Sequence, residues 1–94
     1  MSALDQDADL QAAAAEEMAR ACTLRWEQIR VHVPWGDCFE GFTPAGRAVN
    51  FDRNYLWESQ PEGDIRVEVV VYEPQAYEQG VRLTRWIGPR EDSR

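Results

Sequence analysis

Two stretches in the second half of the chain alternate apolar and polar residues, as β-strands with one buried face do. They span residues 65–72 and 81–87, and their apolar positions are Ile65, Val67, Val69, Val71, Val81, Leu83 and Ile87. We expect both stretches to be strands that pair antiparallel across the loop between them. Arg66, Tyr72, Arg82 and Trp86 fall between the apolar positions, so their side chains should point to the opposite face.

Residues 3–22 instead have the period of an amphipathic helix. Its apolar arc consists of Leu4, Leu10, Ala14, Met18, Ala21 and Cys22. Ser2 suits the N-cap of this helix, and acidic residues in its first turns suit the helix dipole. Asp5, Asp9 and Glu16 lie together on the side opposite the apolar arc and form one acidic stripe.

The end of this helix is ambiguous. Apolar residues keep a helical spacing to about residue 30, but residues 28–33 also alternate with period two and are rich in β-branched side chains. We place the end of the helix near residue 22 and a strand at about 28–33, which ends before Pro34 because the residue before a proline favours extended backbone.

Two shorter strands are expected in the middle of the chain, at about 38–42 and 47–51. The residues between them, 43–46, have Pro at the second position and Gly at the fourth, which suits a type I turn. Residues 52–64 are polar and rich in turn-forming residues, so we expect a loop there, and we expect a polar tail at residues 90–94.

These elements predict a single α+β domain over residues 1–94. The N-terminal amphipathic helix should pack on a curled antiparallel sheet of about five strands. Its apolar arc should cover the sheet face that carries Ile65, Val67, Val69 and Val71.

Composition and charge narrow the classes of function. With 44% hydrophobic residues among 94, the chain can form one modest core and is not expected to be disordered. Its formal net charge of −7 would repel phosphate groups, so we do not expect direct binding to DNA, RNA or an anionic membrane. A protein partner with a basic surface is favoured instead. No apolar stretch is long enough to span a membrane and two cysteines make no disulfide framework, so we expect a cytoplasmic protein.

Candidate catalytic and metal-binding residues are few. His32 is the only histidine and is expected on the polar face of its strand, while Cys38 lacks the context of a nucleophile. With Cys22, these residues do not have the spacing of a zinc site. The acids near the N-terminus lack the Gly and Glu of a calcium-binding loop, and no glycine-rich phosphate loop is present. We therefore expect no enzyme activity, no metal and no cofactor.

The aromatic residues give the strongest indication of function. Four tryptophans exceed what a small core needs, and aromatic residues and arginine are enriched at binding hot spots. The candidate docking residues are Arg66, Tyr72, Arg82 and Trp86 on one strand face, and Trp35 in a turn. We expect a small protein-binding module that acts as a regulator or inhibitor by docking on a partner protein. In a sharper form of this hypothesis, the acidic stripe imitates nucleic-acid phosphates, as small phage inhibitors of host defence do.

Two alternatives remain open at this point. The same strand face would be a second hydrophobic cluster if the loop at 52–64 covered it. Alternatively, Trp35, Tyr72 and Trp86 would stack on the bases of a single-stranded nucleic acid, in a small barrel. An exposed edge strand also leaves a homodimer open.

Overall fold

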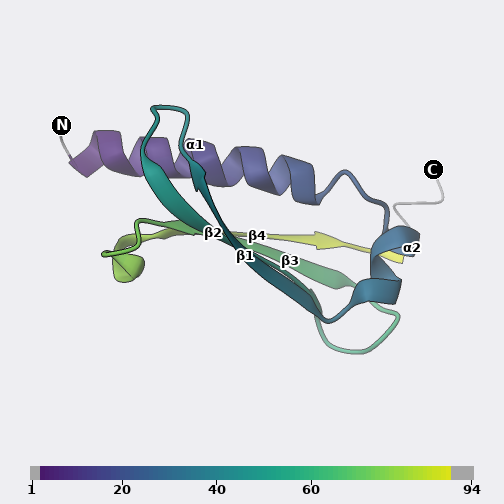
Figure 1. Cartoon of the computed structure of the whole chain (residues 1–94). Helices are drawn as coiled ribbons and strands as arrows, with labels where there is room; N and C mark the ends of the chain where they lie inside the picture. The colour runs from purple at the N-terminus through teal and green to yellow at the C-terminus, as the bar shows by residue number, and fades with distance from the viewer. Residues whose placement is uncertain (1–2, 90–94) are drawn as a thin grey trace.

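A long helix lies across one face of a four-stranded antiparallel sheet in the computed structural model of the chain (Figure 1). The structure describes residues 3–89, with side chains from Ala8 onward. The elements in chain order are α1 (Ala3–Ala21), α2 (Trp26–Ile29), the 3-10 helix η1 (Arg30–His32), β1 (Trp35–Phe42), β2 (Ala48–Trp57), β3 (Ile65–Tyr72), the 3-10 helix η2 (Tyr77–Gln79) and β4 (Val81–Ile87).

The strands follow one another as neighbours, in the order β1-β2-β3-β4. The prediction of an α+β fold with an antiparallel sheet is confirmed, as are the strands at 65–72 and 81–87 and their pairing. The prediction of about five strands in a curled sheet is wrong, because the described chain has four strands and the sheet stays open.

The missing strand is the one expected at 28–33, which is helical instead. A helical turn brings Trp26 and Ile29 to the same side, where Ile29 is 1% exposed and Trp26 donates its indole Nε1–H to the carbonyl of Gly63 at 2.8 Å. The side chain of Gln28 accepts the backbone N–H of Arg25 at 2.9 Å and caps this turn. Val31 is 66% exposed, so the period-two alternation of this segment does not correspond to a buried face.

Two strands are longer than the sequence indicated. β2 continues through half of the segment expected as a loop and ends at Trp57, and β1 begins at Trp35, in the expected turn. Arg53 explains the missed half of β2, because this charged residue occupies a position on the same face as Phe51 and Tyr55, both of which are buried. A charge at an inward position interrupts the alternation from which strands are recognised.

The core lies between α1 and the sheet, where the sequence placed it. The side chains of Ile65, Val67, Val69 and Val71 are fully buried. They share one cluster with Leu10, Ala14, Met18 and Ala21 of α1. Trp26 and Trp57 are partly buried and pack at the margin of this cluster.

Candidate functional site

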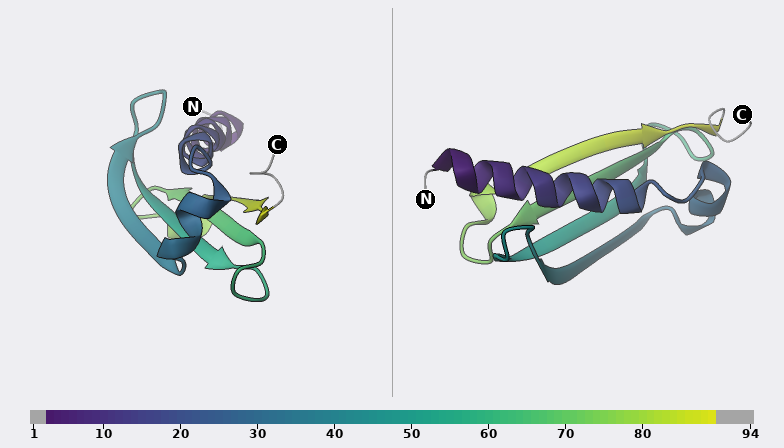
Figure 2. Two further views of the ribbon diagram at one scale, coloured as in Figure 1. Left: turned by 90° about the vertical axis from the view of Figure 1, so that its right-hand side faces the viewer. Right: turned by 90° about the horizontal axis from the view of Figure 1, so that it is seen from above.

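The sheet face turned away from α1, here called the open face, carries most of the candidate docking residues. Alternate residues of the two last strands point to it: Arg66, Glu68, Val70 and Tyr72 of β3, and Arg82, Thr84 and Trp86 of β4. Figure 2 shows α1 along the other side of the sheet, and no helix longer than one turn lies over the open face within residues 3–89. The loop at 58–64 does not cover it, since Trp86 is 50% exposed. The alternative of a hidden hydrophobic cluster under this loop is therefore wrong.

Trp86, Arg66 and Glu58 form a connected group at one end of the open face, here called the Trp86 patch. Arg66 and Trp86 are direct cross-strand neighbours in the register of β3 and β4. The indole Nε1–H of Trp86 donates to Glu58 Oε1 at 2.9 Å, and Arg66 lies 3.4 Å from the same oxygen. Arg66 also pairs with Glu68 at 3.3 Å. These contacts hold the indole at a defined angle while half of its surface stays exposed, as in a preorganised binding anchor.

Tyr72 lies at the opposite end of the open face and is more enclosed. Its hydroxyl lies 3.8 Å from the sulfur of Cys38 and donates to Asp52 at 3.3 Å, and its ring meets the edge of Tyr77 at a centroid distance of 4.7 Å. The contact with Cys38, burial and the charge of Asp52 raise the pKa of Tyr72 to about 12. The hydrogen bond with Asp52 also raises the pKa of the Cys38 thiol, which disfavours a reactive thiolate. Tyr72 lies six positions after Arg66 along β3, a distance of about 20 Å, so the two ends are distinct.

The open face carries more acid than base. Its acidic residues are Glu40, Asp52, Glu58 and Glu68, and its basic residues are Arg66 and Arg82. Arg66 is engaged by two of these acids, whereas the exposed side chain of Arg82 makes no ion pair within residues 3–89. Val70, between the two ends, is buried at 7% exposure, and half-buried Leu56 is the β2 neighbour of Arg66.

Trp35 is not part of this surface. The register places it beside Tyr55 on the α1 side of the sheet, where the two rings tilt against each other with centroids 5.4 Å apart. It lines a hollow of about 240 Å³ together with Leu24, Ile29, His32, Arg53 and Tyr55. Trp35 is thus partly exposed, but it lies on the other face of the sheet from the remaining candidate docking residues.

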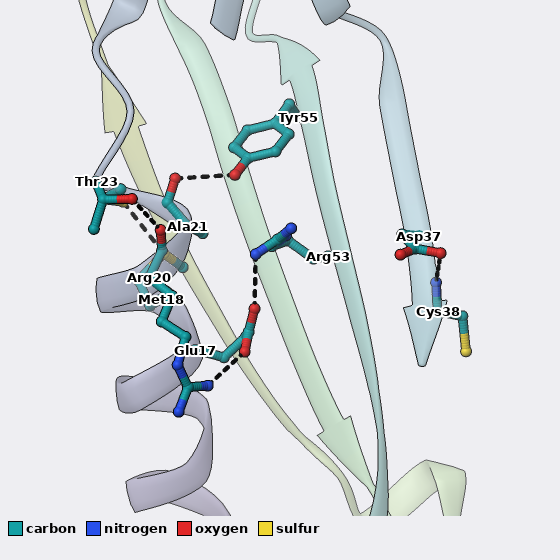
Figure 3. A network of polar contacts seen from close by, with 10 residues as sticks. Glu17, Met18, Arg20, Ala21, Thr23, Asp37, Cys38, Arg53 and Tyr55 are labelled. Atoms are coloured by element: carbon teal, nitrogen blue, oxygen red, sulfur yellow. Dashed lines mark hydrogen bonds and ion pairs between the residues drawn. The ribbon is translucent and has the colours of Figure 1, made fainter. Parts of the chain in front are cut away.

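Arg53 in this hollow belongs to a buried ion-pair network that the sequence analysis did not find (Figure 3). Its guanidinium lies over the ring of Trp35 at 5.3 Å and donates to Glu17 at 2.8 Å. Glu17, whose side chain is 3% exposed, also accepts from Arg20 at 2.9 Å. The available signal was a carboxylate at the margin of the apolar arc of the helix, next to Leu10 on the helical wheel, since buried charges need a partner.

The acidic stripe is interrupted at Asp9. Instead of facing solvent opposite the core, the Asp9 carboxylate accepts the hydroxyl of Thr43 at 2.5 Å and the backbone N–H of Ala45 at 3.2 Å. It also pairs with Arg47 at 3.5 Å. Asp9 thereby ties α1 to the turn between β1 and β2, because the twisted hairpin reaches up beside the helix (Figure 1). Glu16 is exposed, and the side chain of Asp5 lies outside the described residues.

The two candidate catalytic residues, His32 and Cys38, lie on different sides of the sheet. His32 is exposed and lines the hollow on the α1 side, whereas Cys38 lies on the open face, so the structure does not bring the two together. Residues 3–89 contain no group of three or more His, Cys, Asp or Glu side chains arranged to hold a metal ion. None of the helices in this part of the chain is both long and apolar enough to cross a membrane.

The geometry of the open face is thus the main guide to function. Comparison of the chain with models of protein families, with curated proteins and with solved structures gave no match.

Proposed function

We propose that this chain is a non-enzymatic protein-binding module that docks on a partner protein through the open face of its sheet. The observation that carries the proposal is the Trp86 patch, in which a half-exposed indole is oriented by Glu58 beside Arg66. Tryptophan and arginine are the residues most enriched among hot spots of protein interfaces. A regulator or inhibitor would need no more than such a surface.

The charge of the open face indicates a basic partner. Four acidic and two basic residues lie on it, and the whole chain has a formal net charge of −7. A partner surface with Lys or Arg around an apolar centre would complement both the acids and the exposed indole. We also propose a cytoplasmic location, because an oxidising compartment would expose the accessible thiol of Cys38 to disulfide exchange.

The structure gives less support to the two nucleic-acid hypotheses. Trp35 and Trp86 lie on opposite faces of the sheet, so they do not form one stacking platform with Tyr72. Imitation of phosphates by the acidic stripe would need Asp9, whose carboxylate is already bound within the fold.

Affinity capture with matched variants tests the proposal. The baits are the wild-type chain, Trp86→Ala, Arg82→Ala and, as a control, Leu24→Ala, which removes an apolar side chain that is 44% exposed away from the open face. A protein retained by the wild type and the control but lost with both open-face variants is then purified and titrated by calorimetry. We expect Trp86→Ala to raise the Kd by roughly 30-fold, the effect of losing a hot-spot residue.

Salt and activity measurements complete this test. The affinity should fall as ionic strength rises, because a basic partner is attracted by the acidic face. If the partner is an enzyme, one equivalent of the chain should change its rate, as expected for a regulator. Equal affinity of the wild type, Trp86→Ala and Arg82→Ala for the purified partner would refute docking through the open face.

A further inference from the structure

The free edge of the sheet at β4 presents a regular row of backbone groups. In an antiparallel ladder, the N–H and C=O of successive residues point alternately to one neighbour and to the other. Glu58 N–H donates to the carbonyl of Asp64 at 2.9 Å, and this bond continues the pairing of β2 with β3. The even-numbered residues of β2 therefore direct their N–H and C=O groups toward β3. Through the register of β3 with β4, the odd-numbered residues of β4 bond to β3. The N–H and C=O groups of Arg82, Thr84 and Trp86 therefore point away from the sheet.

An independent bond supports this assignment. Thr43 N–H donates to the carbonyl of Arg47 at 2.9 Å, which makes the odd-numbered residues of β1 the ones that bond to β2. The outward groups of β1 are then those of its even-numbered residues. The backbone N–H of Cys38 is consistent with this outward direction, since it donates to the carboxylate of Asp37 at 2.9 Å and not to β2.

The two edges differ in how well they are protected against pairing with another strand. At β1, the carboxylate of Asp37 occupies one outward donor, and Glu40 adds a second negative charge in the middle of the strand. At β4, the seven residues from Val81 to Ile87 include no proline and no acidic residue, and the charged residues of this strand are Arg82 and Arg85. Figure 2 shows β4 as the outer border of the sheet when the molecule is seen from above. β4 is therefore the edge better suited to accept a further strand.

We propose that two copies of this chain associate through their β4 strands, which pair antiparallel about a twofold axis between the two Thr84 residues. The outward backbone groups of Arg82, Thr84 and Trp86 are then satisfied by the same groups of the partner copy. This arrangement joins the two sheets into one of eight strands. The hydrogen bonds of this contact are made by the strand edge, whereas the side chains of Arg82 and Trp86 also belong to the open face that is proposed for docking.

The side chains of β4 fit this register on the open face. Thr84 meets its own counterpart, a favourable cross-strand pair, and Arg82 lies opposite Trp86 of the partner copy. The Arg82 side chain, which makes no ion pair within residues 3–89, can then lie over the exposed half of an indole. Each copy thus contributes a residue to the Trp86 patch of the other.

Charge does not drive this contact, because a twofold axis brings the same patch of the two copies together. Arg82 and Arg85 give β4 two positive charges without an acid on the same strand, and both side chains are exposed. On the α1 side of the sheet, Arg85 lies opposite Leu83 of the partner copy, where its aliphatic stem covers an apolar side chain.

Sedimentation analysis with two proline variants tests this dimer. Because only two short strands meet, we measure at chain concentrations on the order of 0.1 mM and expect a mass of twice 10.8 kDa for the wild type. Thr84→Pro removes one outward N–H at the axis and leaves the bonds between β3 and β4 intact, so it should be monomeric. Glu40→Pro makes the same change at the outward position of β1 and should remain dimeric. Circular dichroism verifies that both variants are folded.

Cross-linking provides a second readout that does not require a proline. In a chain with Cys22→Ser and Cys38→Ser, Thr84→Cys should form a covalent dimer with oxidised glutathione, because directly paired residues have Cα atoms about 5.5 Å apart. Glu40→Cys in the same background should not. A folded wild type that is monomeric at this concentration, or equal cross-linking at positions 84 and 40, would overturn the proposal. A Thr84→Pro monomer that still docks would separate this dimer from the proposed function.

Discussion

Replacement of Glu17 by alanine should destabilise the fold, because it removes a buried charge of α1 that pairs with two arginines. The Glu17 carboxylate is buried, with a side chain 3% exposed, and it lies 2.9 Å from Arg20 and 2.8 Å from Arg53. Glu17→Ala leaves the Arg53 guanidinium between two aromatic rings with no counter-charge. Breaking a buried pair costs about 3–5 kcal/mol when the remaining charge stays buried.

The magnitude is smaller here because the remaining charges regain some water. The side chain of Arg53 is 25% exposed and that of Arg20 is 65% exposed, so we expect a loss of about 2–3 kcal/mol in the free energy of unfolding. A chain of 94 residues typically has a free energy of unfolding of roughly 5–14 kcal/mol. The Tm should therefore fall by about 10–20 °C. Glu17→Gln keeps an acceptor oxygen and should lose about 1–2 kcal/mol.

Urea denaturation followed by tryptophan fluorescence measures these differences, with Glu16→Gln as the matched control. Glu16 is the exposed neighbour of Glu17, so its variant should stay within about 0.5 kcal/mol of the wild type. A double-mutant cycle with Arg53→Met should give a coupling free energy of about 1–3 kcal/mol. If Glu17→Ala and Glu16→Gln unfold at the same urea concentration, or if the coupling is absent, the buried network does not stabilise the fold as argued.

Three further predictions concern other polar contacts. Asp9→Ala should lower the free energy of unfolding by about 1–3 kcal/mol, because this carboxylate accepts two hydrogen bonds from the turn between β1 and β2. The same variant should speed amide hydrogen exchange in that turn, measured by NMR. Tyr55→Phe should lose about 0.5–1.5 kcal/mol in urea denaturation, since the buried hydroxyl donates to the carbonyl of Ala21 at 2.9 Å; a variant as stable as the wild type would contradict this. The pKa of Tyr72 is raised from 10.0 to about 12, so the native state holds the proton longer than the unfolded state and stability should fall as pH rises from about 10 to 12. Tyr72→Phe should weaken this fall, and an unchanged pH profile would count against the raised pKa.

The elements that the sequence predicted correctly are those in which local pattern and tertiary environment agree. β3 and β4 are bounded by turn-forming residues and alternate cleanly, because one face meets α1 and the other does not. Their phase also placed Arg66, Arg82 and Trp86 on the face opposite the core, as the structure has them. Period two along a strand allows no other arrangement once the apolar side is buried.

The predictions failed where a residue pairs with a distant part of the chain. Residues 28–33 alternate as a strand would, but the burial of Trp26 and Ile29 against the sheet makes this segment helical. The inward charge of Arg53 made β2 look like a loop, although Glu17, thirty-six residues earlier, compensates it. A pattern within one segment carries no information about such a partner.

The candidate site divides in the same way. Alternation along β3 and β4 determined which side chains share a face, and it placed tryptophan and arginine there. The excess of acid on this face came from the structure, which adds Glu40, Asp52 and Glu58 to it. Only the tertiary structure decided that no long element within residues 3–89 covers that face, that Trp35 lies on the other side, and that Asp9 holds a turn rather than facing a partner. The reason is physical: the period of a segment defines the direction of its side chains, whereas exposure and ion pairing depend on what the rest of the chain brings next to them.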